Sequence, residues 1–506
     1  MKARLLFSAF ISLLVLSTGV PAYSWQGRMA GMNDPFGLVD DESDFLIHPA
    51  KIAKVEKLNF YGDYRFDFRD VPDWNYSVSY INTTTRSLMA YLPYNSSGDE
   101  RGHEISLGAA LPWGPGTMGF FFQYKGNRND YDGNRLIESH IFTPSDARFG
   151  MGNDLDSIAL RLLYGIPVAG FDLGGEIQLA YYNEKKETKI SDHVSGVYYL
   201  NLPVGGSGNN DNLFPFMRPY DSKYWQAIFK GSLEGGLGPA KFALTLGGGV
   251  ILSGSNSLTF KVIDGPDRGR VNFDGDVRGW NIGGDFWVRY PLKEDISLPF
   301  LLKVRGQKKT RDGDALGAGL FAGTAYYANR ENNFQLEVGG GIDTKLFKDV
   351  KFAGGIYYGF LESRNNFPFG LFLTSGPEIY DDTKCPDQVE HQVILRLAEE
   401  KELSPMGTMR SGLHFFYGKV AKDYESPLGW PETESVGGPH WGISASLGGT
   451  LRFEKFSVEP FLGIGYQKWN LDGTGSISAL NVLGNFTRMN EERKEWFIGG
   501  GFSVKF

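Results

Sequence analysis

Charged side chains alternate with aromatic ones in the first strongly patterned stretch of the chain. The charges stand at every second position: Asp63, Arg65, Asp67 and Arg69. Successive side chains of a β-strand point to opposite faces, so these four share one face and the intervening rings share the other. Such a row of charges would be costly in a dry core but is comfortable against water. The pattern therefore predicts a strand with one face in water and one in an apolar environment.

Later stretches repeat this alternation and add further charges on the polar face. These are Arg161, Glu176, Asp285, Arg289, Lys303, Arg305 and Arg410. Together with the first four they form a predicted set of pore-lining residues. Acidic and basic rows that oppose each other across a pore would filter solutes by charge and dipole. Alternatively, the same side chains only hydrate a wall and pair with their neighbours.

No enzyme, metal or cofactor site is predicted from the residue types. Cys385 is the one cysteine, which excludes a disulfide framework, a cysteine zinc cluster or covalent haem attachment within the chain. None of the seven histidines has the spacing of a metal motif. His414 and Ser411 fall on opposite faces of one predicted strand, so they do not form a nucleophile–base pair. Glycine runs such as GGGV lie inside strand patterns with no helix after them, unlike phosphate loops.

Composition favours a wall that is apolar on one side only. The 506 residues are 41% hydrophobic, yet aromatics reach 14% and glycine counts 67. That glycine content is roughly twice the usual ~7%. The net charge of −8 argues against a nucleic-acid partner.

The alternating pattern recurs often enough to predict sixteen strands of about 11 to 14 residues. They are 58–70, 103–113, 118–127, 156–166, 171–184, 224–235, 241–253, 277–290, 296–308, 333–343, 350–362, 389–400, 408–420, 440–451, 456–469 and 495–506. Connections alternate between tight turns and long loops such as 185–223 and 254–276. This is the signature of an all-β, up-and-down antiparallel barrel that crosses a membrane, with its short turns in the periplasm.

Closure of such a barrel predicts a contact between its first and last strands. Backbone groups in hydrocarbon must all be hydrogen-bonded within the protein, so an open sheet edge is not viable. Strand 58–70 should therefore pair with 495–506, which reads EWFIGGGFSVKF and ends on Phe506. Aromatic residues near strand ends should form interfacial girdles, among them Trp113, Tyr164, Tyr181, Tyr290 and Trp496.

The N-terminus predicts export and a segment ahead of the barrel. Lys2 and Arg4 precede an apolar run too short to span a bilayer, and an A-x-S pattern ends at Ser24. We expect a signal peptide at 1–24, an N-terminal segment at 25–55 and the barrel at 56–506. Residues 25–55 are either a periplasmic leader that packs on the barrel or a plug that enters the lumen.

These features resemble bacterial outer-membrane porin-like proteins at the level of architecture. The resemblance implies residence in the cell outer membrane, contact with its lipid, and recognition of the C-terminal strand by the barrel-assembly machinery. It also implies small solutes as partners and a homotrimer as one expected assembly. The acidic–aromatic–glycine motif of general porins is not found in the third loop. The triplet His48-Pro49-Ala50 partly matches the Asn-Pro-Ala-like motif of fatty-acid-transport-type barrels.

The predicted function is passive diffusion of small polar solutes or ions through a porin channel. Two apolar runs within 185–223 predict that the third long loop folds into the lumen. Two alternatives stay open. One is a transporter of hydrophobic compounds with an N-terminal plug, and the other is a structural barrel that partners an electron-transfer cytochrome.

Overall fold

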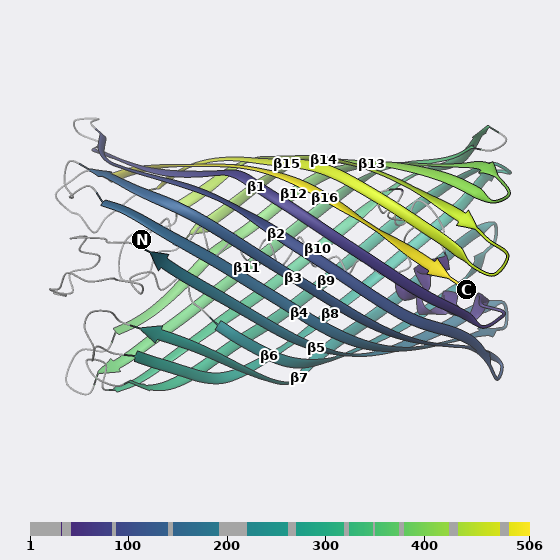
Figure 1. The fold of residues 1–506 in the computed structure, drawn as a ribbon, viewed down its shortest axis with the longest axis horizontal. Coiled ribbons are helices and arrows are strands. Elements are labelled where there is room, and N and C mark those ends of the chain that lie inside the picture. Colours follow the sequence, from purple (N-terminus) through teal and green to yellow (C-terminus); the bar gives the residue numbers. More distant parts are fainter. Residues whose placement is uncertain are drawn as a thin grey trace.

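The computed structural model describes residues 32, 42–82, 88–139, 145–191, 220–261, 270–317, 323–347, 350–373, 379–424, 434–475 and 485–506. These residues form one closed antiparallel barrel (Figure 1). Two short 3₁₀ helices precede it, η1 (Glu42–Leu46) and η2 (Pro49–Lys54). Within the described ranges, no helix is long and apolar enough to cross a membrane.

The barrel has sixteen strands, which confirms the predicted fold class. In chain order they are β1 (Asn59–Asn82), β2 (Leu88–Trp113), β3 (Gly116–Ser139), β4 (Ser145–Val168), β5 (Phe171–Ser191), β6 (Tyr220–Leu237), β7 (Ala240–Lys261), β8 (Arg270–Lys293), β9 (Ile296–Gly317), β10 (Gly323–Phe347), β11 (Val350–Leu373), β12 (Ile379–Ser404), β13 (Gly407–Tyr424), β14 (Glu434–Arg452), β15 (Ser457–Gly475) and β16 (Asn485–Lys505). Each strand pairs with its neighbours in sequence.

The first and last strands close the barrel, as predicted. Their ladder begins with Tyr61 opposite Lys505 and continues through Asp70 opposite Trp496. Beyond it, the backbones of Phe60 and Phe506 exchange two hydrogen bonds of 3.0 and 3.2 Å. The terminal phenylalanine is therefore held at the seam, and no open sheet edge remains there.

The strands are longer than predicted. They contain 18 to 26 residues, because the ladders continue past the apolar segments into polar ones. Residues 75–82 belong to β1 and 88–94 to β2, so they extend strands rather than add new ones. Backbone hydrogen bonds need no apolar side chains, so alternation marks only the part of a strand that lies in an apolar environment. The predicted position of the third loop concerns mainly 192–219, outside the described residues, and stays a prediction.

Tight turns gather at one end of the barrel, where the C-terminus and both helices also lie (Figure 1). The turn between β4 and β5 consists of Ala169 and Gly170, whose φ angles are 49° and 88°. Positive φ at both central residues matches the right-handed twist of the flanking strands, which suits two-residue hairpins. We call this end the turn end and assign it to the periplasmic side.

The outer surface carries an apolar belt next to the turn end. On β5 the outward positions are Phe171, Leu173, Gly175, Ile177, Leu179 and the partly exposed Tyr181. Ten residues of a strand tilted by about 40° rise about 25 Å, the height of the apolar band of outer-membrane barrels. Side chains that stay apolar and exposed over this height indicate lipid contact.

Aromatic pairs border the belt on both sides. Trp113 packs edge-on against Tyr164 near the turns, with ring centroids 6.1 Å apart. At the far edge, Tyr181 lies 5.2 Å from Trp225, and Trp496 lies 4.6 Å from Tyr466. Rings with a polar edge suit the boundary between lipid and water.

Candidate functional site

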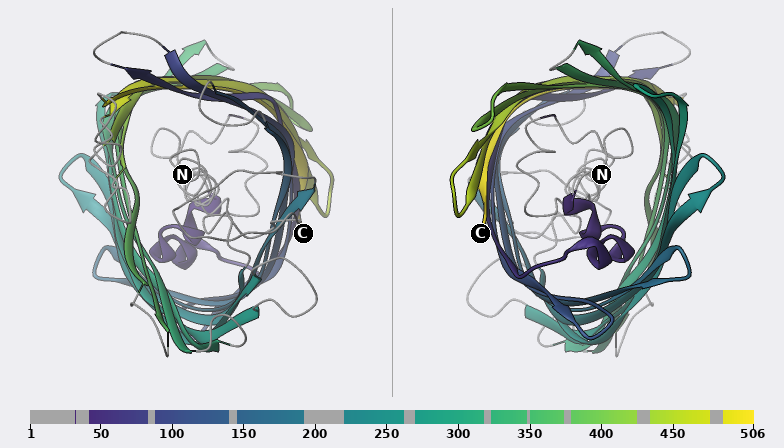
Figure 2. Two further views of the ribbon diagram at one scale, coloured as in Figure 1. Left: turned by 90° about the vertical axis from the view of Figure 1, so that its left-hand side faces the viewer. Right: turned by 90° about the vertical axis from the view of Figure 1, so that its right-hand side faces the viewer.

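The two helices lie inside the ring of strands (Figure 2). Phe45, Leu46, Ile47, Ile52 and Val55 are buried in one cluster with side chains of the inner wall. The wall members are Tyr61, Ala110, Phe121 and Leu163. Residues 42–54, which we call the plug, therefore lie inside the lumen at the turn end, beside β3 to β7. Their role in closing the lumen stays a prediction. The predicted signal peptide lies outside the described residues.

Three inward-facing glycines of the wall make room for this plug. A Cβ atom on Gly174 would collide with the backbone of Pro49 and Ala50. On Gly165 it would lie 2.7 Å from Ile52 Cγ2, and on Gly119 2.5 Å from Ile52 Cδ1. The helix thus approaches β3, β4 and β5 at a distance that only glycine allows.

Hydrogen bonds fix the His48-Pro49-Ala50 triplet to the opposite edge of the same recess. His48 Nδ1 and Thr245 Oγ1 are 2.6 Å apart, and the Ala50 amide donates to Ser232 Oγ at 2.5 Å. Lys54 donates to Glu234 at 2.5 Å. Polar groups of the plug thus find partners on β6 and β7, while its apolar residues pack against side chains of β1 to β4.

Two of the predicted charges, Arg161 and Glu176, form an ion pair that contacts the plug at Leu46. Arg161 donates to both oxygens of Glu176, at 2.8 and 2.9 Å, in a bidentate pair. Lys230 donates to the same carboxylate at 3.2 Å. Both cations also donate to the Leu46 carbonyl, at 2.8 Å from Arg161 and 3.2 Å from Lys230. We call Arg161, Glu176, Lys230 and the Leu46 carbonyl the plug latch.

The four alternating charges of β1 lie on the inner side of the seam. Ser503 donates to Asp63 at 2.5 Å, and the Arg65 guanidinium lies 5.2 Å from the ring centre of Phe461. Arg69 is 3.6 Å from Glu100 and 3.5 Å from Glu495, both on neighbouring strands. Asp67 is exposed.

The remaining predicted charges lie close to groups of opposite charge, on an adjacent strand or, for Arg289 of β8 and Asp343 of β10, on the next strand but one. Arg289 pairs with Asp343, Arg305 lies 3.8 Å from Asp285, and Arg410 donates to Glu400 at 2.7 Å. Lys303 stands directly opposite Asp285 on β8 and Glu337 on β10. In each of these pairs a cation on one strand lies near a carboxylate on a nearby strand. The role of these residues in selectivity stays a prediction.

A further charged cluster ties strands that are not neighbours. Lys309 and Arg311 of β9 each donate to Glu184 of β5 at 2.6 Å. Lys309 also lies 4.8 Å from the ring centre of Tyr224 on β6. These contacts join β5 to β9, which are separated by three strands in the sheet. This cluster was not among the predicted sites, because no local sequence pattern indicates a contact between β5 and β9.

An apolar strip follows the inner wall on the opposite side. Trp469 stacks on His440 with centroids 4.2 Å apart, and His440 lies 4.7 Å from Phe416. Phe416 packs against a buried cluster nearer the turn end, formed by Met32, Leu301, Ala353, Tyr357, Ile394 and Ala398. The apolar strip, from Trp469 to Met32, crosses β15, β14, β13, β12, β11 and β9.

Sequence reasoning did not single out this strip, although one signal was available. Phe416 and His414 share the face of their strand that lies opposite to the exposed Phe415 and Tyr417. A ring on the inward face of a strand is unnecessary for hydrating a pore. An aromatic residue on the otherwise polar face of a strand therefore indicates an apolar contact inside the lumen.

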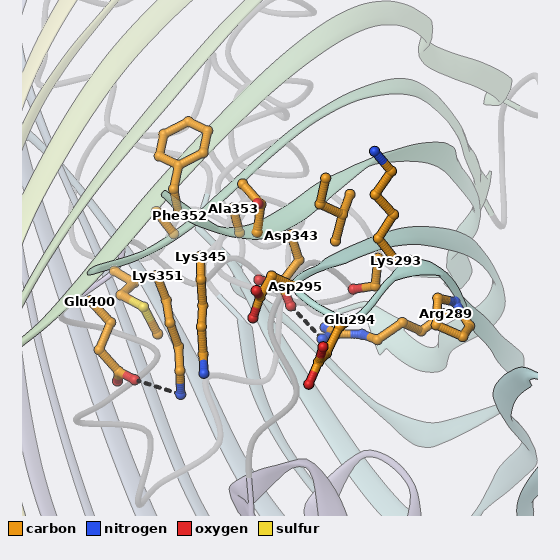
Figure 3. Close-up of a pocket in the computed structure, with 16 residues that line it drawn as sticks. Arg289, Lys293, Glu294, Asp295, Asp343, Lys345, Lys351, Phe352, Ala353 and Glu400 are labelled. Carbon is orange, nitrogen blue, oxygen red and sulfur yellow. Dashed lines mark hydrogen bonds and ion pairs between the residues drawn. The ribbon is translucent and has the colours of Figure 1, made fainter. Parts of the chain in front are cut away.

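The strip ends at a cavity of about 390 Å³ at the turn end (Figure 3). Met32, Ala353 and Ala398 line it together with charges of the β8–β9 and β10–β11 hairpins. Lys351 lies 3.8 Å from Glu400 on one side of it. The cavity thus joins an apolar surface to a charged rim on the periplasmic side.

The closed sheet, the exposed apolar belt and the short turns gathered at one end are together typical of barrels in the bacterial outer membrane. The chain is a β-barrel of the outer membrane. No family model and no curated protein matches it.

Distant solved structures resemble the chain over most of its length. A FadL homologue from Pseudomonas aeruginosa is 10% identical, with a TM-score of 0.39 over 94% of this chain and 97% of that one. The toluene transporter TbuX of Ralstonia pickettii is 10% identical, with 0.40 over 96% and 98%. The toluene transporter TodX of Pseudomonas putida is 10% identical, with 0.36 over 92% and 94%. Sequence identities and TM-scores this low carry no argument about function.

Proposed function

We propose that the protein transports small hydrophobic molecules across the outer membrane through a plugged barrel. The apolar strip from Trp469 to Met32 is the observation that carries this proposal. It is a row of buried and partly buried side chains, apolar except for His440, which contacts Glu390, and it leads along the inner wall to a cavity at the periplasmic end. A hydrophobic solute would gain free energy along it by leaving water, at roughly 25 cal/mol per Å² of buried apolar area.

The plug supports the same proposal over an open porin. Residues 42–54 occupy the turn end beside β3 to β7, and the plug latch holds them there. The charges that a polar-solute pore would present are engaged with neighbouring carboxylates or cations. A barrel that sheathes a cytochrome would need this part of its lumen free for a partner.

Binding of N-phenyl-1-naphthylamine to the purified barrel tests the proposal, with energy transfer from tryptophan as the signal. We expect saturable binding by the native protein and affinity weaker by roughly tenfold or more in Phe416→Asp, because the new charge interrupts the strip. Asn281→Asp is the matched control. It places the same carboxylate on the inner wall of β8, away from the strip, and should leave the affinity within about twofold.

Swelling of vesicles that contain the native protein distinguishes a porin for polar solutes from the proposed transporter of hydrophobic molecules. Steady permeation by small sugars, with no saturable dye binding, would return the function to passive diffusion of polar solutes. Equal dye affinity in Phe416→Asp and Asn281→Asp would show that the apolar strip does not bind the solute.

A further inference from the structure

An imidazole interrupts the apolar strip at His440. Its Nδ1 atom lies 2.6 Å from a carboxylate oxygen of Glu390, and the same oxygen accepts a hydrogen bond of 2.8 Å from Gln392. An ionised carboxylate only accepts hydrogen bonds, so the imidazole donates from Nδ1 in this contact. The contact fixes the orientation of the ring and leaves its Nε2 atom for a second interaction.

The two polar ring atoms at this point of the strip are buried without partners. Within the described ranges, neither Nε2 of His440 nor Nε1 of Trp469 has a hydrogen-bond partner. Both residues are only 5% exposed. Buried polar groups are nearly always hydrogen-bonded, because a buried group without a partner loses its hydration uncompensated. Two such groups on neighbouring strands indicate a place for a polar group of a ligand.

Stacking holds both nitrogens in one short section of the strip. His440 stands directly opposite Trp469 in the β14–β15 ladder, and the two rings are nearly parallel, at 14°, with centroids 4.2 Å apart. His440 lies on the inward face of β14, opposite to the exposed Ile443. Its partner on the other side, in the β13–β14 ladder, is Gly418, which adds no side chain there. A solute that follows the strip therefore meets both nitrogens together.

The neighbouring strand on the other side of Trp469 keeps the indole in place. Arg493 of β16 stands directly opposite Trp469, with its guanidinium 5.0 Å from the ring centre. Arg493 is itself paired with Glu495. The indole is thus packed between an imidazole and a guanidinium that are both held by carboxylates. A donor that is rigid before binding loses little conformational entropy when a ligand arrives.

We propose that His440 and Trp469 bind a hydroxyl group, so that the transported solutes are hydrophobic molecules with one hydroxyl. This inference rests on the proposed function and names its substrate class. A hydroxyl is both a donor and an acceptor. Its proton fits Nε2, which is an acceptor in the tautomer that donates from Nδ1 to Glu390. Its oxygen fits the Nε1–H of Trp469, which is only a donor.

Other solute classes fit the two nitrogens less well. A pure hydrocarbon leaves both of them buried and unpaired, and this costs free energy. A carboxylate offers no proton to Nε2 and places a second negative charge near Glu390. The hydroxyl alone satisfies the donor and the acceptor at once.

Competition between two matched solutes tests the hydroxyl site. Naphthalene and 2-naphthol differ by one hydroxyl, and each is titrated against N-phenyl-1-naphthylamine bound to the purified native barrel, followed by the fluorescence of the dye. We expect 2-naphthol to compete roughly tenfold or more tightly than naphthalene. A purely apolar site would give the opposite order, because a hydroxyl buried without a partner costs free energy.

Two variants each remove one nitrogen and keep a ring in the stack, Trp469→Phe and His440→Phe. Glu390 keeps its hydrogen bond from Gln392 in the second. We expect the preference for 2-naphthol over naphthalene to fall roughly fivefold or more in each variant. Trp287→Phe is the matched control. It removes another buried indole from the inner wall, on β8 beside Lys51 of the plug, and should leave the preference within about twofold.

The outcomes separate this inference from the proposed function. A native protein without saturable dye binding contradicts both. Saturable dye binding with equal competition by the two solutes, or with none, overturns the hydroxyl site and leaves transport of hydrophobic molecules standing. An equal loss of preference in Trp287→Phe also overturns the site, because the loss of any indole would then have the same effect. Mobility on gels before and after heating verifies that each variant is folded.

Discussion

Replacing Gly174 with leucine is expected to open the lumen. Its Cβ would occupy the position of the Pro49 and Ala50 backbone, so residues 48–52 cannot stay in their recess. The ring of strands would persist, because its ladders do not depend on the plug. In planar bilayers we expect the single-barrel conductance of Gly174→Leu to exceed that of the native protein by roughly tenfold or more.

Gly175→Leu is the matched control for this prediction. The adjacent glycine faces the other side of β5, where the nearest atom to an added Cβ is the Lys230 carbonyl oxygen at 3.8 Å. The control barrel should conduct like the native one. If both variants conduct alike, the plug does not limit passage through the barrel.

Replacing Glu176 with leucine is expected to destabilise the barrel and release the plug. The carboxylate joins Arg161 and Lys230, and the Arg161 side chain has only 3% of its surface exposed. Breaking a buried pair leaves a charge that neither water nor a carboxylate compensates, at a cost of about 3–5 kcal/mol. Urea unfolding in micelles, followed by tryptophan fluorescence, measures the change in the free energy of unfolding.

Glu492→Leu provides the comparison, because it removes an equally charged side chain from exposed pairs. Glu492 lies 2.7 Å from Lys468 and 3.7 Å from Lys494, and 38% of its side-chain surface is exposed. We expect a loss of about 0–1 kcal/mol there. Similar losses at both positions would mean that the plug latch contributes no more than a surface pair.

The two variants test different parts of one device. Gly174→Leu removes space for the plug and leaves the plug latch intact, whereas Glu176→Leu weakens the latch and leaves the space. High conductance in the first with native stability would show that the plug adds little to the stability of the wall. High conductance in both would assign the latch a role in keeping the lumen closed.

Alternation along the sequence determined the wall of this protein. The exposed Phe66 and Phe68 and the inward Asp63 follow from the two-residue period of a strand, which needs no knowledge of neighbours. The strand count and the seam between β1 and β16 follow as well, since hydrocarbon leaves no viable open edge. Strand ends could not be read in this way, because the ladders extend beyond the lipid belt into polar segments.

Only the tertiary structure decided what the wall encloses. Lys309 of β9 donates to Glu184 of β5, and Met32 shares a buried cluster with Tyr357, although the members of each set are far apart in the chain. The same inward charge can line water or hold a plug, and the difference depends on which side chain lies opposite it. Arg161, one of the predicted pore-lining residues, donates to Glu176 and to the Leu46 carbonyl, because the fold brings the N-terminal segment to its side. Strand periodicity specifies the face on which a side chain lies, whereas its partner in the lumen depends on barrel curvature and on the course of residues 42–54.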